Sequence, residues 1–206
     1  MQIDDILAVN GLSVEQLAAY SYKSSLGLSL VRTIHRFDKD ALLQDLFTYT
    51  SYLEDIDIAS QVALDYRIKC YESIVNKYNR YYPNAQACKV FNDILGFRAF
   101  CGDYTDIINS KSDILHIVDM SHGKAKDDGY RGVHVYFQLD NFHYPIEIQF
   151  NTLFDRQLND WLHDYVYKRD YPLSVGQLLR DKYEHEVIKT ENEFKEVLYG
   201  LCSSKE

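Results

Sequence analysis

Hydrophobic residues in the first third of the chain recur at intervals of three or four positions. That spacing places Leu42, Leu46, Tyr49 and Leu53 on one face of a helix. A second stripe with helical spacing runs from Leu64 to Tyr78. Nearer the N-terminus, Ser13 and Gln16 stand in the pattern of a capping box, so a further helix is predicted to begin there.

The pattern changes in the middle of the chain, where short apolar segments alternate with polar residues. Strands are predicted at 97–101, 114–120, about 130–138 and 143–150. Alternation along the third strand puts Val133, Val135 and Phe137 on one face, and Tyr130, His134 and Tyr136 on the other. Asp140 and Asn141 are turn-forming residues, so the last two strands are predicted to form a hairpin around them.

Helical spacing returns after residue 150. One stripe consists of Phe154, Leu158, Trp161, Leu162 and Tyr165. A long last helix is predicted to extend to Leu201, opened by Ser174 and Gln177. Helices, then strands, then helices predict an α+β fold with a mixed sheet, and no Ser/Gly-rich linker marks a domain boundary.

Composition narrows the class of protein. Hydrophobic residues make up 46% of the chain, which is enough for a globular core. No apolar run approaches the roughly 20 residues of a membrane helix, and the N-terminus carries acids where a signal peptide needs bases. Together with four scattered cysteines, this predicts a cytoplasmic protein without membrane contact. A net charge of −9 argues against a general polyanion binder, so any nucleic-acid contact needs a local patch.

The two strands of the predicted hairpin also bring polar side chains together. A turn at 140–141 sets a register in which His134 faces Glu147, with Gln149 two residues further along the same face. An imidazole, a carboxylate, an amide and a tyrosine then share one patch. The alternative interpretation is the solvent-facing side of an antiparallel sheet, which is commonly polar.

A second carboxylate precedes an earlier strand. Asp93 is followed by Gly96, which permits a close approach, and by Arg98. Asp93 and Glu147 are therefore candidates for a pair of carboxylates that holds Mg²⁺. This cation is often bound by one or two carboxylates together with substrate phosphates.

Basic residues gather just upstream. Arg67 and Lys69 are two positions apart, so an extended segment would put both on one side. Ser73 and Lys77 are four positions apart, so a helix would align them. We therefore expect the helix to begin near Tyr71. The alternative is a solvated basic face of a helix.

Five segments stand in a recognisable order. They are RIK-x3-S-x3-K at 67–77, DILGFR at 93–98, K-x2-GYRGVH at 126–134, EIQ at 147–149 and W-x-H-x3-YK at 161–168. Together they resemble the synthetase domain of the RelA/SpoT family, whose members transfer pyrophosphate from ATP to a ribose 3′-hydroxyl. The resemblance implies a nucleotidyltransferase-like fold, in which helices flank a mixed sheet.

The resemblance also implies a role for each candidate residue. On the ATP side, Arg67 and Arg98 sandwich the adenine, Lys69 and Lys77 hold the phosphates, and Ser73 lies beside them. The implied Mg²⁺ ligands are Asp93 and Glu147, and Glu147 also assists deprotonation of the attacking hydroxyl. On the acceptor side, Tyr130 stacks on the base, Lys126 and His134 contact a phosphate or the sugar, and Gln149 orients the acceptor. The catalytic set is thus Asp93, Glu147 and Tyr130.

Two departures from the family pattern are Cys70 and Gly132, which stand where serine is usual. We expect activity to survive both, and Gly132 to widen the acceptor pocket. The His163-Asp164 pair lies too far downstream to be the motif of the family's hydrolase domain. We expect a single synthetase domain over 1–206, without a hydrolase domain or regulatory tail. It consists of a helical N-terminal extension at about 1–60, a catalytic core at about 60–170 and a helical C-terminal region at about 173–201.

The acceptor has two candidates. One is GDP or GTP, which gives the alarmone (p)ppGpp of the stringent response. The other is the 3′-CCA end of tRNA, whose pyrophosphorylation blocks translation. The segment 155–168 looks more like the toxic branch of the family, so we favour tRNA; a neutralising antitoxin protein is then the expected partner. Basic residues for such a contact are Lys23, Arg32, Arg36 and Lys39. A further alternative is a catalytically silent nucleotide-binding module, and oligomerisation stays open.

Overall fold

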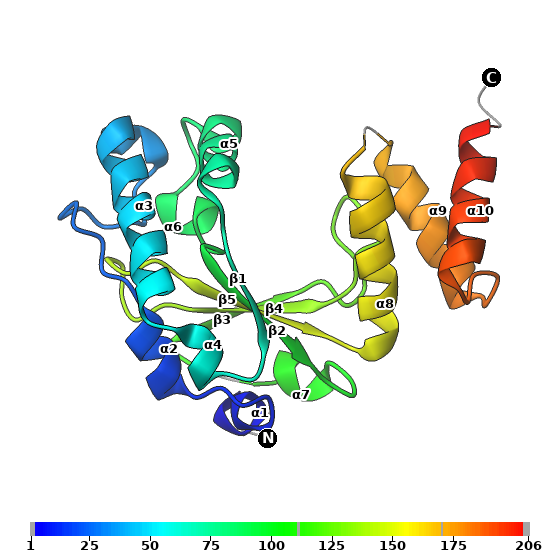
Figure 1. Ribbon diagram of the computed structural model, residues 1–206, viewed down its shortest axis with the longest axis horizontal. Coiled ribbons are helices and arrows are strands. Elements are labelled where there is room, and N and C mark those ends of the chain that lie inside the picture. Colours follow the sequence, from blue (N-terminus) through cyan, green and yellow to red (C-terminus); the bar gives the residue numbers. More distant parts are fainter. Residues whose placement is uncertain (1–2, 111, 170, 204–206) are drawn as a thin grey trace. The chain divides into compact units, whose positions relative to one another are not determined.

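The computed structural model describes residues 3–110, 112–169 and 171–203. Five strands form one sheet in the order β1-β2-β5-β4-β3. Their bounds are Asp65–Ile68 (β1), Leu95–Phe100 (β2), Leu115–Asp119 (β3), Val133–Phe137 (β4) and Ile146–Asn151 (β5). Helices precede, interrupt and follow the strands (Figure 1). The predicted α+β class, a mixed sheet flanked by helices, is confirmed.

The helical segments fall into three groups along the chain. Before the sheet come α1 (Ile3–Val9), α2 (Val14–Tyr20), η1 (Ile34–Arg36), α3 (Lys39–Asp55) and α4 (Ile58–Gln61). Between strands lie α5 (Tyr71–Tyr81), α6 (Ala87–Val90) and α7 (Thr105–Ile108). After the sheet come α8 (Leu153–Leu162), the π-helix η2 (His163–Tyr167), α9 (Leu173–Glu184) and α10 (Glu191–Ser203). Within the described part of the chain, no helix has the length and apolar character needed to cross a bilayer.

Contacts divide the chain into two compact units. The first comprises Met1–Ala99, Thr105–Ile117 and His134–Gln149, and the second comprises Phe100–Tyr104, Val118–Val133 and Phe150–Glu206. The prediction of one synthetase domain with helical ends stays a prediction.

Two helices of the first unit, α2 and α3, begin where the sequence signals a cap. Ser13 and Gln16 form the predicted capping box at the start of α2, each side chain accepting from the other residue's backbone N–H. Asp38 caps α3 by accepting a hydrogen bond from the Ala41 N–H. The predicted apolar stripe of α3 is buried, as expected: Leu42, Leu46, Tyr49 and Leu53.

A buried carboxylate in the first unit links α3 by hydrogen bonds to the segment before it and to Tyr144. Asp45 of α3 is only 3% exposed. Its oxygens accept hydrogen bonds from the hydroxyls of Ser24 at 2.7 Å, Ser25 at 2.7 Å and Tyr144 at 2.8 Å. Burial of a carboxylate is tolerable only when such donors replace its hydration shell. Three separate stretches of chain therefore meet at one side chain.

We predict that Asp45→Ala lowers the free energy of unfolding by about 2–4 kcal/mol, because the buried hydroxyls of Ser24 and Tyr144 lose their acceptor. Urea denaturation followed by circular dichroism measures this. The matched control is Asp40→Ala, which removes an exposed carboxylate from the same helix and should change stability by less than about 1 kcal/mol. Equal losses of unfolding free energy for the two substitutions would contradict a stabilising role of the Asp45 hydrogen bonds.

The segment before α5 is extended, as the spacing of its basic residues predicts. Strand β1 pairs antiparallel with β2, with Asp65 opposite Arg98 and Arg67 opposite Gly96. Helix α5 begins at Tyr71, as predicted. The stripe from Leu64 to Tyr78 is thus a strand followed by a helix.

The hairpin differs from its predicted form at the turn. Strands β4 and β5 are neighbours, but their turn is centred on Asn141 and Phe142, since the His143 N–H donates to the Asp140 carbonyl at 3.2 Å. Asp140 therefore occupies the first position of the turn. Its side chain accepts from the Phe142 N–H at 2.7 Å, an arrangement that aspartate favours there. The predicted turn centre at 140–141 is wrong by one residue.

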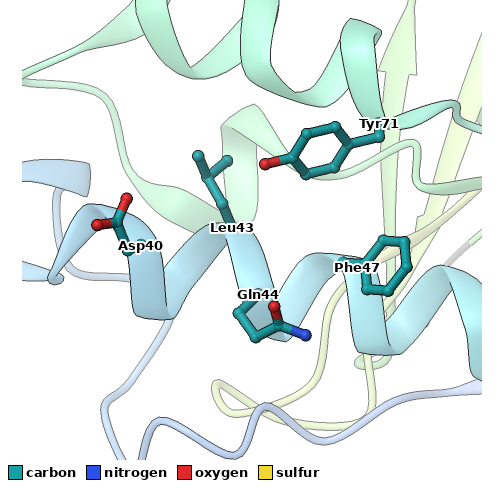
Figure 2. Close-up of a pocket in the computed structure, with 5 residues that line it drawn as sticks. All are labelled: Asp40, Leu43, Gln44, Phe47 and Tyr71. Carbon is teal, nitrogen blue, oxygen red and sulfur yellow. The ribbon is translucent and has the colours of Figure 1, made fainter.

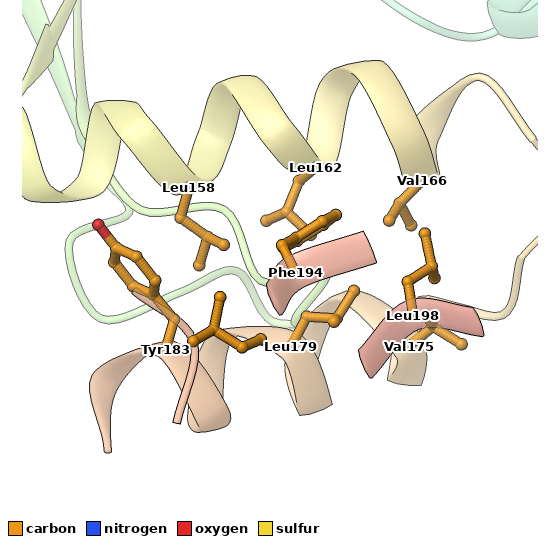
Figure 3. Close-up of a cluster of buried hydrophobic side chains, with 9 residues drawn as sticks. Leu158, Leu162, Val166, Val175, Leu179, Tyr183, Phe194 and Leu198 are labelled. Carbon is orange, nitrogen blue, oxygen red and sulfur yellow. The ribbon is translucent and has the colours of Figure 1, made fainter. Parts of the chain in front are cut away.

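The second unit has its own core, shown in Figure 3. The buried side chains come from α8, η2, α9, α10 and the link before α10: Leu158, Leu162, Val166, Val175, Leu179, Tyr183, Ile188, Phe194 and Leu198. The predicted stripe on α8 is thus partly confirmed, because Leu158 and Leu162 are fully buried whereas Phe154 is about half-exposed.

The prediction of one long last helix is wrong. Helix α9 ends at Glu184, Glu186 adopts a left-handed φ of 58°, and α10 begins at Glu191. Thr190 and Glu193 cap the new helix reciprocally, since each side chain accepts from the other's backbone N–H. Helix α9 also begins one residue before Ser174, with Pro172 at its N-cap.

Candidate functional site

Six predicted site residues line one small pocket in the first unit. The pocket has a volume of about 50 Å³, and its lining is Arg67, Lys69, Asp93, Gly96, Phe97, Arg98, Glu147 and Gln149. These residues come from β1, β2, β5 and the segments next to them. We call this the Asp93 pocket. Segments far apart in the sequence therefore place two carboxylates, an amide and three cations around one space.

Two lysines share the Asp93 carboxylate. The Lys69 Nζ lies 2.6 Å from one oxygen, and the Lys77 Nζ lies 2.9 Å from the other. Burial lowers the pKa of Lys69, although the neighbouring Asp93 carboxylate opposes this shift. Two cations against one anion leave a surplus of positive charge, which suits the binding of phosphate groups.

Glu147 is buried and fully engaged. Its carboxylate lies 2.9 Å from His134 Nδ1 and accepts hydrogen bonds from Tyr136 at 3.0 Å and Gln149 at 2.7 Å. The predicted meeting of His134 with Glu147 is therefore confirmed. Burial tends to raise the pKa of Glu147, but the contacts from His134, Gln149 and Tyr136 together hold it below its usual value. The carboxylate is ionised at neutral pH.

Tyr136 was predicted to share the face of His134, but no role in the site was predicted for it. Its hydroxyl touches Glu147 and lies 3.3 Å from His134 Nδ1. The signal was present, because Tyr136 stands two residues after His134 and therefore shares its face of the strand.

We predict that Tyr136→Phe raises the pKa of Glu147, because one hydrogen bond to the ionised carboxylate is lost. The acid limb of the pH–rate profile then moves to higher pH, and kcat/KM falls roughly two- to tenfold. The control is Tyr71→Phe, which removes a hydroxyl from a half-exposed ring that does not line this pocket. An unchanged acid limb would remove Tyr136 from the site.

Ser73 and Cys70 contact each other at the start of α5. The Cys70 Sγ lies 3.1 Å from the Ser73 Oγ, and Ser73 is not among the residues that line the Asp93 pocket. Cys70 stands at the N-cap of α5 without a side-chain hydrogen bond to the helix backbone. The hydrogen bond from Ser73 lowers the pKa of the Cys70 thiol.

A larger hollow lies between α3 and the start of α5. It has a volume of about 460 Å³, and Figure 2 shows the five side chains that line it: Asp40, Leu43, Gln44, Phe47 and Tyr71. This lining is one carboxylate, one amide and three apolar or aromatic groups. Of the two lysines expected to hold phosphates, Lys69 lines the smaller Asp93 pocket, and Lys77 does not line it but pairs with Asp93. The described residues that line the larger hollow therefore include none of the cations that phosphate binding needs.

The remaining acceptor-side residues, Lys126 and Tyr130, belong to the second unit. Tyr130 lies in a short segment that we call the Tyr130 loop, residues 127–132. Lys124 places its Nζ 4.9 Å from the centre of the Tyr130 ring and pairs with Asp128 at 2.7 Å. Arg131 pairs with Asp127 through both terminal nitrogens, at 2.8 and 3.0 Å.

The space expected beside Gly132 is filled. A Cβ at this position would lie 2.6 Å from the Asn151 Nδ2 and 2.8 Å from the Tyr130 hydroxyl. The expectation that Gly132 widens the acceptor pocket is therefore wrong. The glycine instead allows the Tyr130 hydroxyl and the Asn151 amide to approach the backbone.

The two carboxylates predicted to hold a magnesium ion both line the Asp93 pocket, and in this structure each Asp93 oxygen contacts a lysine. Carboxylate oxygens are the ligands that Mg²⁺ prefers. Among the described residues, no group of three or more His, Cys, Asp or Glu side chains is placed to hold a metal. Any ion held there would depend on two carboxylates, with phosphates and water completing its shell, which is usual for Mg²⁺.

Comparison with known proteins gives the family. Residues 66–171, just over half of the chain, match the model of the region found in RelA / SpoT proteins. The chain therefore belongs to the RelA/SpoT family. No curated protein matches it.

Solved structures that are similar to the chain carry related descriptions. Small alarmone synthetase 2 from Bacillus subtilis is 25% identical, with a TM-score of 0.43 over 81% of this chain and 98% of the other. Small alarmone synthetase 1 from Bacillus subtilis, bound to its product pppGpp, is 20% identical, with a TM-score of 0.42 over 80% and 93%. A GTP pyrophosphokinase family protein from Streptococcus pneumoniae is 22% identical, with a TM-score of 0.42 over 80% and 93%. The family assignment rests on the sequence match.

Proposed function

We propose that this protein transfers the β,γ-pyrophosphate of ATP to the 3′-hydroxyl of an acceptor ribose. The observation that carries the proposal is the Asp93 pocket, where three cations, two carboxylates and an amide converge. Phosphoryl transfer needs little covalent chemistry from the protein, and depends mainly on positioning and on charge neutralisation.

The ATP side follows from the pairing of β1 with β2. Arg67 lies opposite Gly96, and Arg98 lies two residues further along β2. Diagonal neighbours of this kind share one face of the strand pair, with their positions on the strands about 7–8 Å apart. The Arg98 guanidinium is paired with Asp65 at 3.2 Å. Arg67 and Arg98 bind the adenine in our proposal. Lys69 and Lys77 exchange part of their contact with Asp93 for contact with the phosphates.

The reaction forms a bond between the acceptor 3′-oxygen and the β-phosphorus, breaks the bond from that phosphorus to the α-phosphate oxygen, and releases AMP. In our proposal Glu147 accepts the hydroxyl proton, and Gln149 orients the acceptor. Mg²⁺, held by Asp93 and Glu147, would supply neutralisation of the phosphate charge. The proposal draws support from the ionised state of Glu147, since a base must be unprotonated before it can accept the proton.

We further propose the 3′ end of tRNA as the acceptor. Three cations lie in or next to the Tyr130 loop: Lys124, Lys126 and Arg131. Two of them are paired with carboxylates, Lys124 with Asp128 and Arg131 with Asp127. A 5′-diphosphate or triphosphate needs several uncompensated cations, whereas a terminal nucleoside of a polynucleotide needs mainly a stacking surface. In our proposal the ring of Tyr130 supplies that stacking surface.

The decisive experiment supplies the protein with Mg²⁺ and ATP labelled at the β-phosphate. Deacylated tRNA, GDP and GTP are offered in separate reactions. We expect label on tRNA, and none on tRNA whose terminal ribose has been oxidised by periodate, because the 3′-hydroxyl is then destroyed. Gel electrophoresis and thin-layer chromatography separate the products.

Each other outcome selects an alternative. Label on GDP or GTP but not on tRNA means alarmone synthesis, and no transfer to any acceptor means a silent nucleotide-binding module. In cells, transfer to tRNA predicts growth arrest that persists when alarmone hydrolases are present. Such toxicity implies a neutralising antitoxin protein in the same cytoplasm.

The role of Tyr130 has its own test. We predict that Tyr130→Phe keeps most of the activity, because the ring that stacks is retained. Tyr130→Ala should raise the KM for the acceptor about tenfold or more, since stacking on a base contributes about 1–3 kcal/mol. Steady-state kinetics with varied acceptor measure both. Wild-type kinetics for Tyr130→Ala would exclude Tyr130 from the acceptor site.

A further inference from the structure

A buried arginine from the C-terminal helices forms a hydrogen bond with the backbone of the Tyr130 loop. Arg180 of α9 is 1% exposed, and its Nε donates to the Gly129 carbonyl at 2.8 Å. Its two terminal nitrogens donate to Asp155 at 2.7 Å and to Asn159 at 3.1 Å. One guanidinium thereby joins α9, α8 and the residue that immediately precedes Tyr130.

The loop backbone also forms hydrogen bonds with side chains at Arg131, which follows Tyr130, and at Asp128. The Asn159 amide donates to the Arg131 carbonyl at 2.7 Å, and its oxygen accepts from the Arg131 N–H at 3.2 Å. Asn151 donates to the same carbonyl at 2.9 Å, and the Tyr167 hydroxyl donates to the Asp128 carbonyl at 3.1 Å. The backbone on both sides of Tyr130 is thus fixed by side chains from β5, α8, η2 and α9.

Two glycines bring helix α9 against this loop. Gly129 has a φ of +89°, and a Cβ there would lie 2.3 Å from the Gly176 carbonyl oxygen. A Cβ on Gly176 would lie 2.0 Å from the Asp128 carbonyl oxygen. Any side chain at either position would push α9 away from the loop. The close approach lets Arg180 reach the Gly129 carbonyl.

Packing alone does not explain why an arginine, and not an apolar residue, is buried at position 180. Removing a guanidinium from water is costly, and an apolar side chain of similar volume commonly stabilises such a position as well or better. What an apolar side chain cannot do is bind three acceptors from three segments in one rigid plane. The arrangement therefore points to a requirement for a fixed backbone at Tyr130.

We propose that Arg180 is a positioning residue for the acceptor, acting through the Tyr130 loop; this rests on the proposed function of Tyr130 as the platform for the acceptor base. Because Arg180 is 1% exposed, its effect on the acceptor is exerted through the loop. It sets the direction of the Tyr130 ring by holding the preceding carbonyl. The C-terminal helices thus determine acceptor binding, while ATP binding depends on the Asp93 pocket.

The test compares binding of the two substrates to Arg180→Ala. We expect the KM for deacylated tRNA to rise about tenfold or more, because a charged hydrogen bond to the loop is lost, and the KM for ATP to stay within about twofold. Added guanidinium ion, at concentrations that do not unfold the wild type, should restore part of the acceptor affinity by occupying the vacated space. The matched control is Arg156→Ala, which removes an arginine that pairs with Asp160 within α8 and should leave both constants unchanged.

A milder variant keeps the inference testable if Arg180→Ala fails to fold. Tyr167→Phe removes only the hydroxyl that binds the Asp128 carbonyl, from a side chain that is 38% exposed. We expect a smaller rise in the KM for tRNA, about two- to fivefold, with no change for ATP. Fluorescence titration of labelled tRNA against each variant gives the same comparison as a dissociation constant, without turnover.

The outcomes separate the two proposals. Wild-type protein that transfers pyrophosphate to no acceptor overturns the proposed function and this inference with it. An active wild type whose folded Arg180 and Tyr167 variants lose affinity for ATP and tRNA alike, or for neither, overturns the inference alone. Selective loss of tRNA affinity with rescue by guanidinium supports it.

Discussion

The pairing of β1 with β2 is the constraint on which the Asp93 pocket depends. The antiparallel register sets Arg67 opposite Gly96 and Asp65 opposite Arg98. The hydrogen bond from the Lys69 N–H to the Ile94 carbonyl continues this alignment beyond the strand. Shifting the register by one residue would turn every side chain to the other face. The two arginines and Lys69 then could not line the same space, and the pocket would lose its positive charge.

Charge balance is the second feature that shapes the site. Asp93 is held by two lysines, and Glu147 by three neutral or weakly basic groups, so the two carboxylates experience different surroundings. Around Asp93 the cations outnumber the anion, which favours an incoming polyphosphate. Around Glu147 the hydrogen bonds keep the carboxylate ionised despite its burial. The same pocket therefore combines a region of positive charge, at the lysines around Asp93, with an ionised carboxylate, that of Glu147.

Errors in the prediction arose where local signals competed. The long last helix was predicted because apolar spacing continues across the break, and the link between α9 and α10 contains no glycine or proline. The capping box of Thr190 and Glu193 was the signal that a new helix begins after Thr190. The turn was misplaced because Asp140 suits more than one turn position. The role of Arg180 could not be predicted, since an arginine inside a helix is expected from sequence to be exposed to solvent.

The sequence by itself determined the family, the α+β class and most of the helices and strands, because apolar periodicity and short ordered motifs are local properties of the chain. It also indicated which charged residues to consider together. Only the tertiary structure decided that six of the predicted site residues line one pocket, that the Tyr136 hydroxyl contacts Glu147, and that Arg180 holds the backbone beside Tyr130. These contacts depend on strand register and on helix packing between residues far apart in the chain. No local pattern encodes such distances.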